Sequence, residues 1–171
     1  MKAIVYNSNT GFTKRYAEML SQATGLKAYA LKDAYRALPK DTHIIYLSWI
    51  MGNTLPQIGK VSSTFYLGAI GAVGLNPSEL TETVLRTDCG LPNAFPMFLL
   101  PGGLKLEKLN LFHRVMLKMV EKQTARKVRK AVRPSEDSLL FLDQLRNGCD
   151  MVSGEALAPM AEWANGWKEL P

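Results

Sequence analysis

The stretch KAIVYNSNTGFT, residues 2–13, decides the fold of this 171-residue chain. Its first part, residues 2–6, is a short and mostly apolar run with Ile and Val, which is typical of a buried strand. After it, apolar residues recur at helical spacing at Phe12, Tyr16, Met19, Leu20 and Ala23. The sequence therefore predicts a strand over 2–6, a tight turn, and a helix over 11–24.

The turn between these two elements offers the groups that bind an anion. Ser8, Thr10 and Thr13 supply hydroxyls, and the turn contains no acidic residue. Gly11 allows the backbone to approach a ligand closely. The N-terminus of the following helix adds backbone N–H groups and the positive end of the helix dipole. The alternative is a Ser/Thr-rich helix cap that binds no ligand.

The turn resembles the phosphate loop of the flavodoxins. The pattern Ser8-x-Thr10-Gly11-x-Thr13 is similar to the family pattern (Ser/Thr)-x-Thr-Gly-x-Thr at every fixed position, and it follows the first strand, as in that family. The resemblance implies an FMN cofactor. It also implies the residues that bind the FMN phosphate, which are Ser8, Asn9, Thr10, Gly11, Phe12 and Thr13.

A second segment extends the resemblance. Residues 48–56, SWIMGNTLP, follow the predicted third strand and look like the flavodoxin segment Thr-Trp-x-x-Gly-x-x-x-Pro, with Ser48 in place of Thr. A flavin ring needs a flat apolar face and backbone groups at its edges. The resemblance implies that this face is lined by Ser48, Trp49, Ile50, Met51, Gly52 and Asn53. A tryptophan at a strand end that packs into the core is the alternative.

The remaining pattern alternates strands with helices. Strands are predicted over 26–31, 42–49, 65–73 and 96–100, and helices over 33–38, 55–63, 77–88, 107–130 and 136–147, with a further turn over 158–168. This alternation predicts an α/β fold with a doubly wound, five-stranded parallel sheet and helices on both faces. The flavodoxin order 2-1-3-4-5 places ligands at the carboxyl ends of the strands. We expect a single domain over residues 1–171.

The loop after the predicted fourth strand supplies a third expected contact, through Ala72, Val73 and Gly74. Its glycines suit an ordinary turn equally well. Neither residues 48–58 nor residues 71–78 contain Asp or Glu. Because acidic groups near a flavin disfavour its anionic reduced form, we expect a flavin that is less reducing than that of a typical flavodoxin.

The net charge of +6 is concentrated in residues 105–133, which hold ten Lys or Arg and two Glu, a charge of +8, so the rest of the chain carries −2. A basic amphipathic helical segment is expected at about 104–133, and an apolar stripe runs through it at Leu109, Phe112, Met116, Met119 and Val120. One interpretation is a helix that packs on the sheet and shows its charges to solvent. The other is an element that touches an anionic membrane surface or an acidic partner. Nucleic acid is not expected, because no aromatic residues interleave the charges.

A looser resemblance covers about a quarter of the chain. Residues 98–105, FLLPGGLK, and residues 116–119, MLKM, look like the corresponding part of the menaquinone-dependent protoporphyrinogen oxidases of the flavodoxin superfamily. That resemblance implies an enzyme that passes electrons to a quinone at the membrane face, with Lys or Arg holding the propionates of a porphyrinogen. The Trp49-x-x-Gly52 loop departs from that subgroup, and residues 134–171 match no pattern.

The sequence thus leaves three functions open: an electron carrier or reductase with a redox partner protein, the quinone-linked oxidase, and a non-catalytic domain that has lost FMN. Two distant cysteines and an N-terminus that begins with a strand favour a cytoplasmic protein, free or at the membrane face. No proton-transferring residue is assigned. His43 is expected to be structural, and His113 to have a surface role. The electron donor, electron acceptor and oligomeric state are not indicated.

Overall fold

The computed structural model describes residues 1–75 and 82–167 and divides the chain into two compact units. Unit 1 consists of Met1–Gly102 and Val152–Pro171, and unit 2 consists of Gly103–Met151. The chain therefore leaves unit 1 after its last strand and re-enters it before its last helix. The expected basic segment at 104–133 lies within unit 2.

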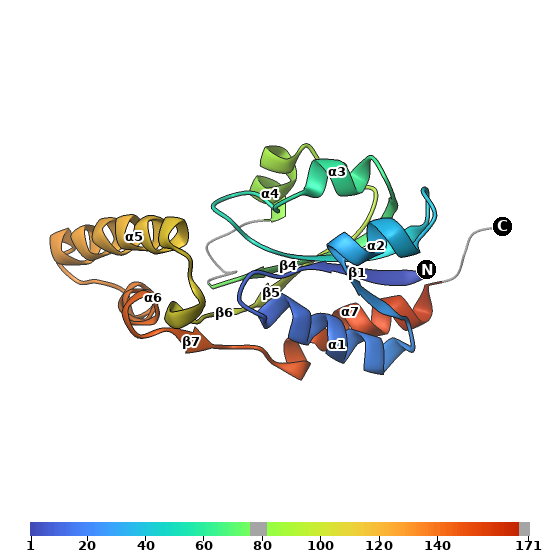
Figure 1. The fold of residues 1–171 in the computed structure, drawn as a ribbon. Coiled ribbons are helices and arrows are strands. Elements are labelled where there is room, and N and C mark those ends of the chain that lie inside the picture. Colours follow the sequence, from blue (N-terminus) through green and yellow to red (C-terminus); the bar gives the residue numbers. More distant parts are fainter. Residues whose placement is uncertain (76–81, 168–171) are drawn as a thin grey trace. The chain divides into compact units, whose positions relative to one another are not determined.

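Unit 1 is built on a parallel sheet. Its strands are β1 (Ala3–Asn7), β2 (Ala28–Ala30), β3 (His43–Trp49), β4 (Tyr66–Gly74) and β5 (Met97–Pro101). In the described part of the chain they pair in the order β2-β1-β3-β4-β5, and every pair is parallel (Figure 1). The predicted doubly wound order 2-1-3-4-5 is confirmed. It follows from buried apolar runs that are joined by right-handed helical crossovers.

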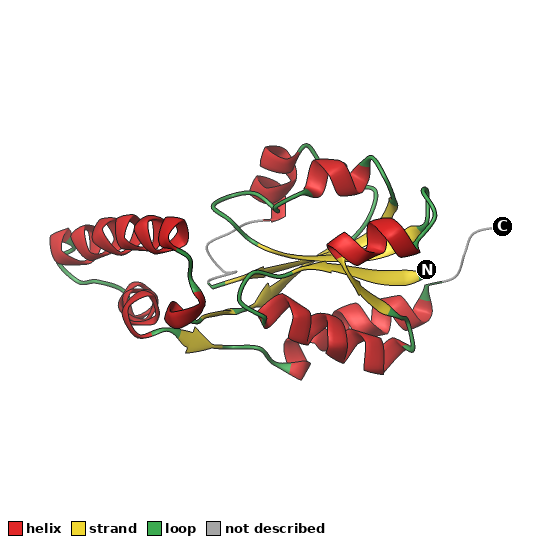
Figure 2. Cartoon of the chain, in the orientation of Figure 1, coloured by secondary structure: helices red, strands yellow, loops and turns green. Residues whose placement is uncertain are grey.

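Helices cover both faces of this sheet (Figure 2). On one face lie α1 (Phe12–Thr24) and α7 (Gly154–Gly166), and on the other lie α2 (Leu31–Ala37), α3 (Ile58–Ser62) and α4 (Glu82–Cys89). Alternation along the strands supplies both cores. Val5 and Tyr46 belong to the core cluster under α2 and α3, whereas Ile4 and Leu47 belong to the cluster under α1 and α7.

Several element boundaries differ from the sequence expectations. The predicted strand over 26–31 is only three residues long, because Leu31 already begins α2. Helix α3 is shorter than 55–63, since Gln57 immediately before it has a φ of 68°. The predicted helix over 77–88 is described only from Glu82, and residues 76–81 lie outside the described part of the chain.

Helix α7 is the largest correction in unit 1. The sequence predicts only a turn over 158–168, whereas α7 has 13 residues and contains Pro159. Proline removes a backbone donor and disfavours a helix interior, so the local signal is weak. The helix forms because Leu157, Met160 and Ala164 are buried in the cluster under α1 and α7.

Unit 2 contains β6 (Gly103–Leu104), the 3₁₀ helix η1 (Leu106–Lys108), α5 (Leu111–Lys130), α6 (Glu136–Asn147) and β7 (Cys149–Asp150). Strands β6 and β7 pair antiparallel, so the chain enters and leaves unit 2 through one short ribbon. Helix α5 begins four residues later than predicted, because the Asn110 side chain caps it by accepting the His113 N–H at 2.9 Å. Helix α6 has its predicted bounds.

The two cysteines, Cys89 and Cys149, are free thiols, and each is half-buried. In residues 1–75 and 82–167, no helix combines the length and the apolar character needed to cross a membrane.

The phenol of Tyr16 joins three segments of unit 1. Tyr16 is fully buried on α1, and its hydroxyl donates to the carbonyl of Pro101 at 2.7 Å, at the end of β5. The same hydroxyl accepts the N–H of Ser153 at 3.2 Å, and Ser153 is the N-cap of α7. One oxygen therefore ties the last residue of the sheet to the first turn of the final helix.

We expect Tyr16→Phe to lower the free energy of unfolding by about 1–3 kcal/mol, because it leaves a half-buried carbonyl and a half-buried N–H without this partner. Urea unfolding followed by tryptophan fluorescence measures the change. The matched control is Tyr66→Phe, which removes the hydroxyl of a tyrosine that is 54% exposed, and which should change stability by less than about 0.5 kcal/mol. Equal effects of the two substitutions would contradict the structural role of the Tyr16 hydroxyl.

Candidate functional site

The candidate site lies where the loops after β1 and β3 leave the carboxyl edge of the sheet. These two strands are neighbours, but the helices that follow them, α1 and α3, lie on opposite faces. Loops that diverge in this way leave a crevice at the strand ends, which is where doubly wound sheets bind ligands. The two segments that the sequence singled out, residues 8–13 and 48–53, both belong to this edge.

The loop after β1 ends in a helix that lacks a side-chain cap. Gly11, the N-cap of α1, has a φ of 103°, and its N–H donates to Ser8 Oγ at 3.2 Å. Among the described helices, the N-cap residues of α1, α2 and α3 make no side-chain cap hydrogen bond, whereas α5, α6 and α7 are each capped by Asn or Ser. The first turn of α1 holds no acidic residue. The positive end of the α1 dipole faces the loop, as at helix termini that bind anions.

Of the six predicted phosphate-loop residues, Gly11 has no side chain, and the other five divide into two groups. Phe12 and Thr13 are 3% and 1% exposed, and their side chains anchor the loop to the core, so they offer a ligand only backbone groups. Ser8 and Thr10 are half-buried and Asn9 is exposed. The side chains available to an anion are therefore those of Ser8, Asn9 and Thr10.

The loop after β3 forms a tight hairpin. Met51 and Thr54 exchange two backbone hydrogen bonds of 2.9 and 3.2 Å, and Gly52 at the tip has a φ of 61°. Gly52 and Asn53 are exposed, while Trp49, Ile50 and Met51 are half-buried. The positive φ explains why glycine occupies this position of the predicted flavin segment.

Two residues that the sequence did not single out hold the base of this hairpin. The carbonyl of Pro56 accepts hydrogen bonds from the Tyr46 hydroxyl at 2.9 Å and from Asn7 Nδ2 at 3.2 Å. These contacts connect the loop to β3 and β1. Burial raises the pKa of Tyr46 to about 12, so the phenol keeps its proton and donates. A tyrosine within an apolar strand predicts only a buried side chain, so no local sequence pattern indicated that Tyr46 holds the Pro56 carbonyl.

An open pocket of about 650 Å³ gathers residues from three strand ends. Ser8, Asn9 and Trp49 line it together, as do Lys32, Tyr35 and Lys60, which the sequence did not single out. Among the described residues of its lining there are two lysines and no carboxylate. The pocket therefore combines an aromatic surface with positive charge, which suits an anionic ligand with a flat apolar part.

Tyr35 is the most unusual residue of this pocket. Its hydroxyl is buried and has no hydrogen-bond partner in the part of the chain that the structure describes. Its ring stacks on Phe65 at 5.8 Å, and Lys60 Nζ lies 4.6 Å from the ring centroid. Burial raises the pKa of Tyr35. An unsatisfied buried hydroxyl costs free energy unless a ligand or water completes it.

The other predicted contacts lie in less accessible places. Ser48 is fully buried, and its hydroxyl donates to the Trp49 carbonyl at 3.2 Å. The side chains of Ala72 and Val73 belong to the two core clusters, so of the expected third contact only Gly74 reaches the edge within the described residues. A Cβ on Gly74 would lie 2.9 Å from Ile50 Cδ1, so the ends of β3 and β4 are in close contact there. Asn76 and Pro77 of that loop lie outside the described residues.

Neither of the two histidines belongs to the loops at the carboxyl edge of the sheet. His43 is the first residue of β3, at the amino end of the strand, and its ring lies 5.1 Å from that of Tyr66. His113 belongs to α5 in unit 2. The sequence interpretation assigned neither of them to catalysis.

Stability should fall above pH 10 through Tyr46. Its pKa is about 12 in the folded state and 10.0 for an unperturbed tyrosine, so between these values the unfolded chain releases a proton that the folded chain keeps. Stability from this group is fully present below pH 10 and is lost as the pH rises through 12, by about 2–3 kcal/mol in total. Urea unfolding of wild type and Tyr46→Phe at a series of pH values measures this. An unchanged pH dependence in Tyr46→Phe would contradict the assignment.

Comparison with known proteins by sequence identifies no family for this chain. No protein-family model matches the sequence, and no curated protein matches it. The sheet topology and the residues of the carboxyl edge are the features that indicate a function.

Proposed function

We propose that this protein binds FMN at the carboxyl edge of unit 1 and acts as an oxidoreductase or electron-transfer protein. The observation that carries the proposal is the Ser8–Gly11 turn at the N-terminus of α1, next to a pocket that includes Trp49 and holds no carboxylate among its described lining residues. FMN, when bound, supplies one-electron and two-electron redox chemistry, and the protein supplies binding, orientation and electrostatics.

The donor set of the first loop fits a phosphate group. Ser8 and Thr10 are accessible hydroxyls, and the first turn of α1 adds backbone N–H groups with the positive end of its dipole. The lysines of the neighbouring pocket, Lys32 and Lys60, add positive potential without a carboxylate to offset it among the described lining residues. Hydrogen bonds to a charged phosphate are stronger than those between neutral groups.

The second loop fits a flat ring. Trp49 is half-buried at the end of β3, so part of its indole remains accessible for stacking. The hairpin beyond it exposes Gly52 and Asn53, whose backbone and amide groups can hydrogen-bond polar ring edges. Tyr46 and Asn7 act as positioning residues, because they hold the Pro56 carbonyl at the base of this hairpin.

The charges around the proposed ring site favour a reduced, anionic flavin. Neither residues 48–58 nor the described part of the loop after β4 contains Asp or Glu. A carboxylate nearby would repel a negative ring, and about 1 kcal/mol of such repulsion corresponds to roughly 40 mV in a one-electron couple. We therefore assign this chain a less reducing flavin than an acidic flavodoxin would hold.

Purified protein that is incubated with excess FMN and desalted should keep an absorbance band near 450 nm. Ser8→Ala and Thr10→Ala should each weaken FMN binding about tenfold, because each removes one hydrogen bond to a charged group. Riboflavin, which lacks the phosphate, should bind the wild type and both variants equally. Fluorescence titration of the wild type and the two variants with each flavin measures the six affinities.

The matched control is Ser62→Ala, which removes an exposed hydroxyl on α3 outside the pocket. It should leave both affinities unchanged. A colourless wild-type protein would refute FMN binding. Equal losses for FMN and riboflavin in Ser8→Ala and Thr10→Ala would refute the assignment of this loop to the phosphate.

A new carboxylate beside the proposed ring site should change the reduction potential of the bound flavin. Asn53→Asp places one on the exposed tip of the hairpin and should lower the potential at which the bound flavin becomes anionic by roughly 40 mV. Gln22→Glu adds the same charge on the exposed surface of α1 and should leave the potential unchanged, since solvent screens distant charges. Potentiometric titration monitored by absorbance measures both values, and equal shifts would contradict a flavin ring beside the hairpin.

A further inference from the structure

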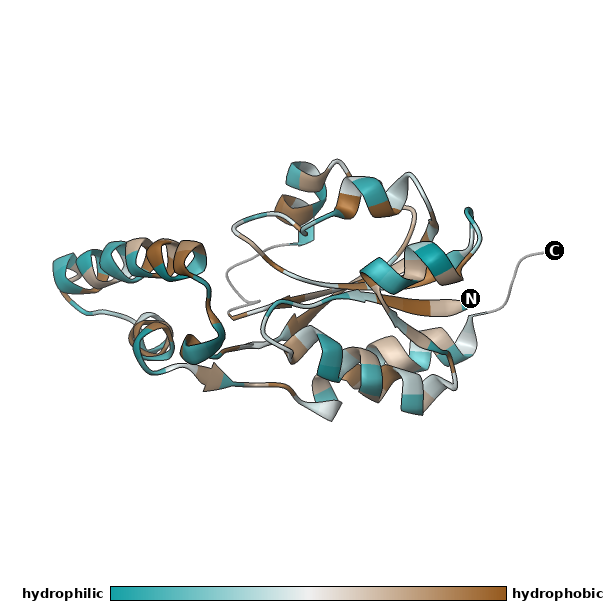
Figure 3. Cartoon of the chain, viewed as in Figure 1, coloured by the Kyte–Doolittle hydropathy of each residue, from teal (hydrophilic) through white to brown (hydrophobic). Residues whose placement is uncertain are grey.

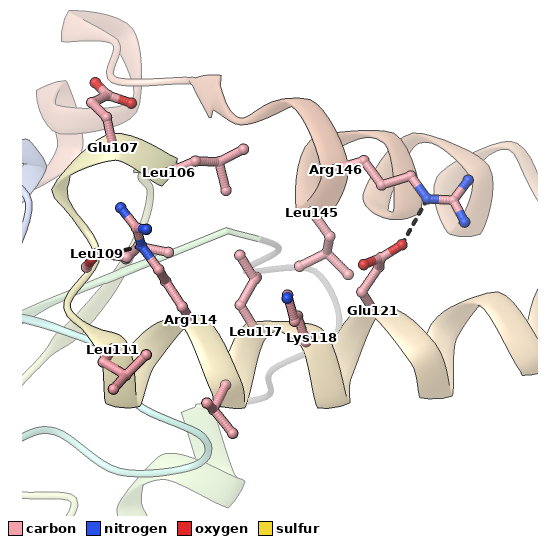
Figure 4. A pocket seen from close by; sticks show the side chains of 11 residues that line it. Leu106, Glu107, Leu109, Leu111, Arg114, Leu117, Lys118, Glu121, Leu145 and Arg146 are labelled. Carbon is pink, nitrogen blue, oxygen red and sulfur yellow. Dashed lines mark hydrogen bonds and ion pairs between the residues drawn. The ribbon is translucent and has the colours of Figure 1, made fainter.

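Helix α5 of unit 2 has 20 residues, and none of its described side chains is fully buried. Isolated helices of this length are marginal in water, so most helices gain stability by burying an apolar face. Its partly buried side is the one that meets α6. Leu117 of α5 and Leu145 of α6 point toward one another, and Glu121 accepts the Arg146 Nε–H at 2.9 Å (Figure 4).

The opposite side of α5 is apolar and exposed over its first half. Helical spacing places the partly buried His113, Leu117 and Glu121 on one side of the helix. The same spacing places another set on the opposite side, with exposed fractions of 80, 63, 52 and 58% for Leu111, Phe112, Val115 and Met119. Of the apolar stripe that the sequence predicted, Phe112 and Met119 therefore lie away from α6. We name these four residues the apolar half-face.

The same outward side is basic over the second half of α5. Helical spacing continues it with Lys122, Arg126, Arg129 and Lys130, and all four are exposed. Figure 3 shows this division, with brown over the first turns of α5 and teal over the last ones. The whole helix carries seven Lys or Arg and one Glu. The outward side is therefore an apolar segment followed by a cationic one.

A pocket of about 670 Å³ adjoins the apolar half-face and shares Leu111 and Val115 with it. Leu106, Leu109 and Leu117 add apolar lining (Figure 4). Its charged lining holds three cationic side chains, Arg114, Lys118 and Arg146, and two carboxylates, Glu107 and Glu121, of which Glu121 is paired with Arg146. Apolar lining with an excess of positive charge suits a molecule that has an acyl chain and an anionic head.

The positive charge of α5 favours an anionic lipid surface over a second copy of the chain as the partner of this face. A second copy of the chain would bring seven cationic side chains against seven, which opposes association. An anionic lipid surface satisfies both segments, because phosphate headgroups attract Lys and Arg while apolar side chains enter the boundary between headgroups and acyl chains.

We propose that unit 2 docks this protein onto anionic phospholipid bilayers. The apolar half-face enters the boundary of the acyl chains, and Lys122, Arg126, Arg129 and Lys130 contact the headgroups. The pocket beside Leu111 and Val115 receives part of an acyl chain. This docking is independent of FMN, so the protein binds the surface whether or not its flavin site is filled.

Sedimentation of the full chain without added flavin, with vesicles of equal parts phosphatidylcholine and phosphatidylglycerol, tests the proposal. Vesicles of phosphatidylcholine alone are the reference. We expect binding to the anionic vesicles only, weakened by added salt because the headgroup contacts are screened. Phe112→Ser with Met119→Ser should lower the partition coefficient by about tenfold or more, since the two apolar side chains no longer enter the bilayer.

Arg126→Gln with Lys130→Gln should also lower the partition coefficient, by about tenfold. The matched control, Lys14→Gln with Lys40→Gln, removes the same charge from exposed positions of unit 1 and should leave binding nearly unchanged. Circular dichroism confirms that each variant is folded.

Three outcomes would overturn the proposal. The first is an absence of binding to anionic vesicles. The second is binding that Phe112→Ser with Met119→Ser leaves unchanged, which would mean adsorption by charge alone. The third is a dimer in size-exclusion chromatography that the same pair abolishes, which would assign the apolar half-face to a second copy of the chain.

Discussion

The Tyr16 hydroxyl is the constraint on which the closure of unit 1 depends. It binds the carbonyl of Pro101 and the N–H of Ser153, which lie on either side of the stretch that forms unit 2. Because both ends are fixed to one buried side chain of α1, α7 can complete the core under the sheet although 52 residues separate it from β5. The Tyr16 hydroxyl thereby joins the two parts of unit 1 that flank residues 103–151 in the sequence.

The parts of the fold that could be predicted are those that local patterns encode. Short β-branched runs identified the strands, and their alternation with helices predicted a doubly wound parallel sheet. The order 2-1-3-4-5 came from the resemblance to the flavodoxins, and the structure has this order. Helix α7 was missed because Pro159 weakens its pattern, and only burial against α1 reveals it. Strands β6 and β7 have two residues each, which is too short for any periodicity to show.

The residues of the candidate site also divide into those that a local sequence pattern indicated and those that it did not. Ser8–Thr13 and the hairpin after β3 were found because hydroxyls, glycines and a tryptophan stand at fixed spacing. Lys32, Tyr35 and Lys60 were missed because they come from two helices, α2 and α3, and converge with the loop residues only in the folded chain. Tyr46 and Asn7 were missed because their function is to hold the Pro56 carbonyl, and such support leaves no pattern in the sequence.

The β6–β7 ribbon determines which part of this chain can be lengthened, shortened or exchanged during evolution. Gly103 pairs with Asp150, so the two connections between the units run side by side. An insertion whose ends are adjacent can be lengthened, shortened or exchanged without moving the elements on either side of it. Residues 103–151 therefore form a replaceable module, and selection can change this module while the sheet and helices of unit 1 keep their sequence.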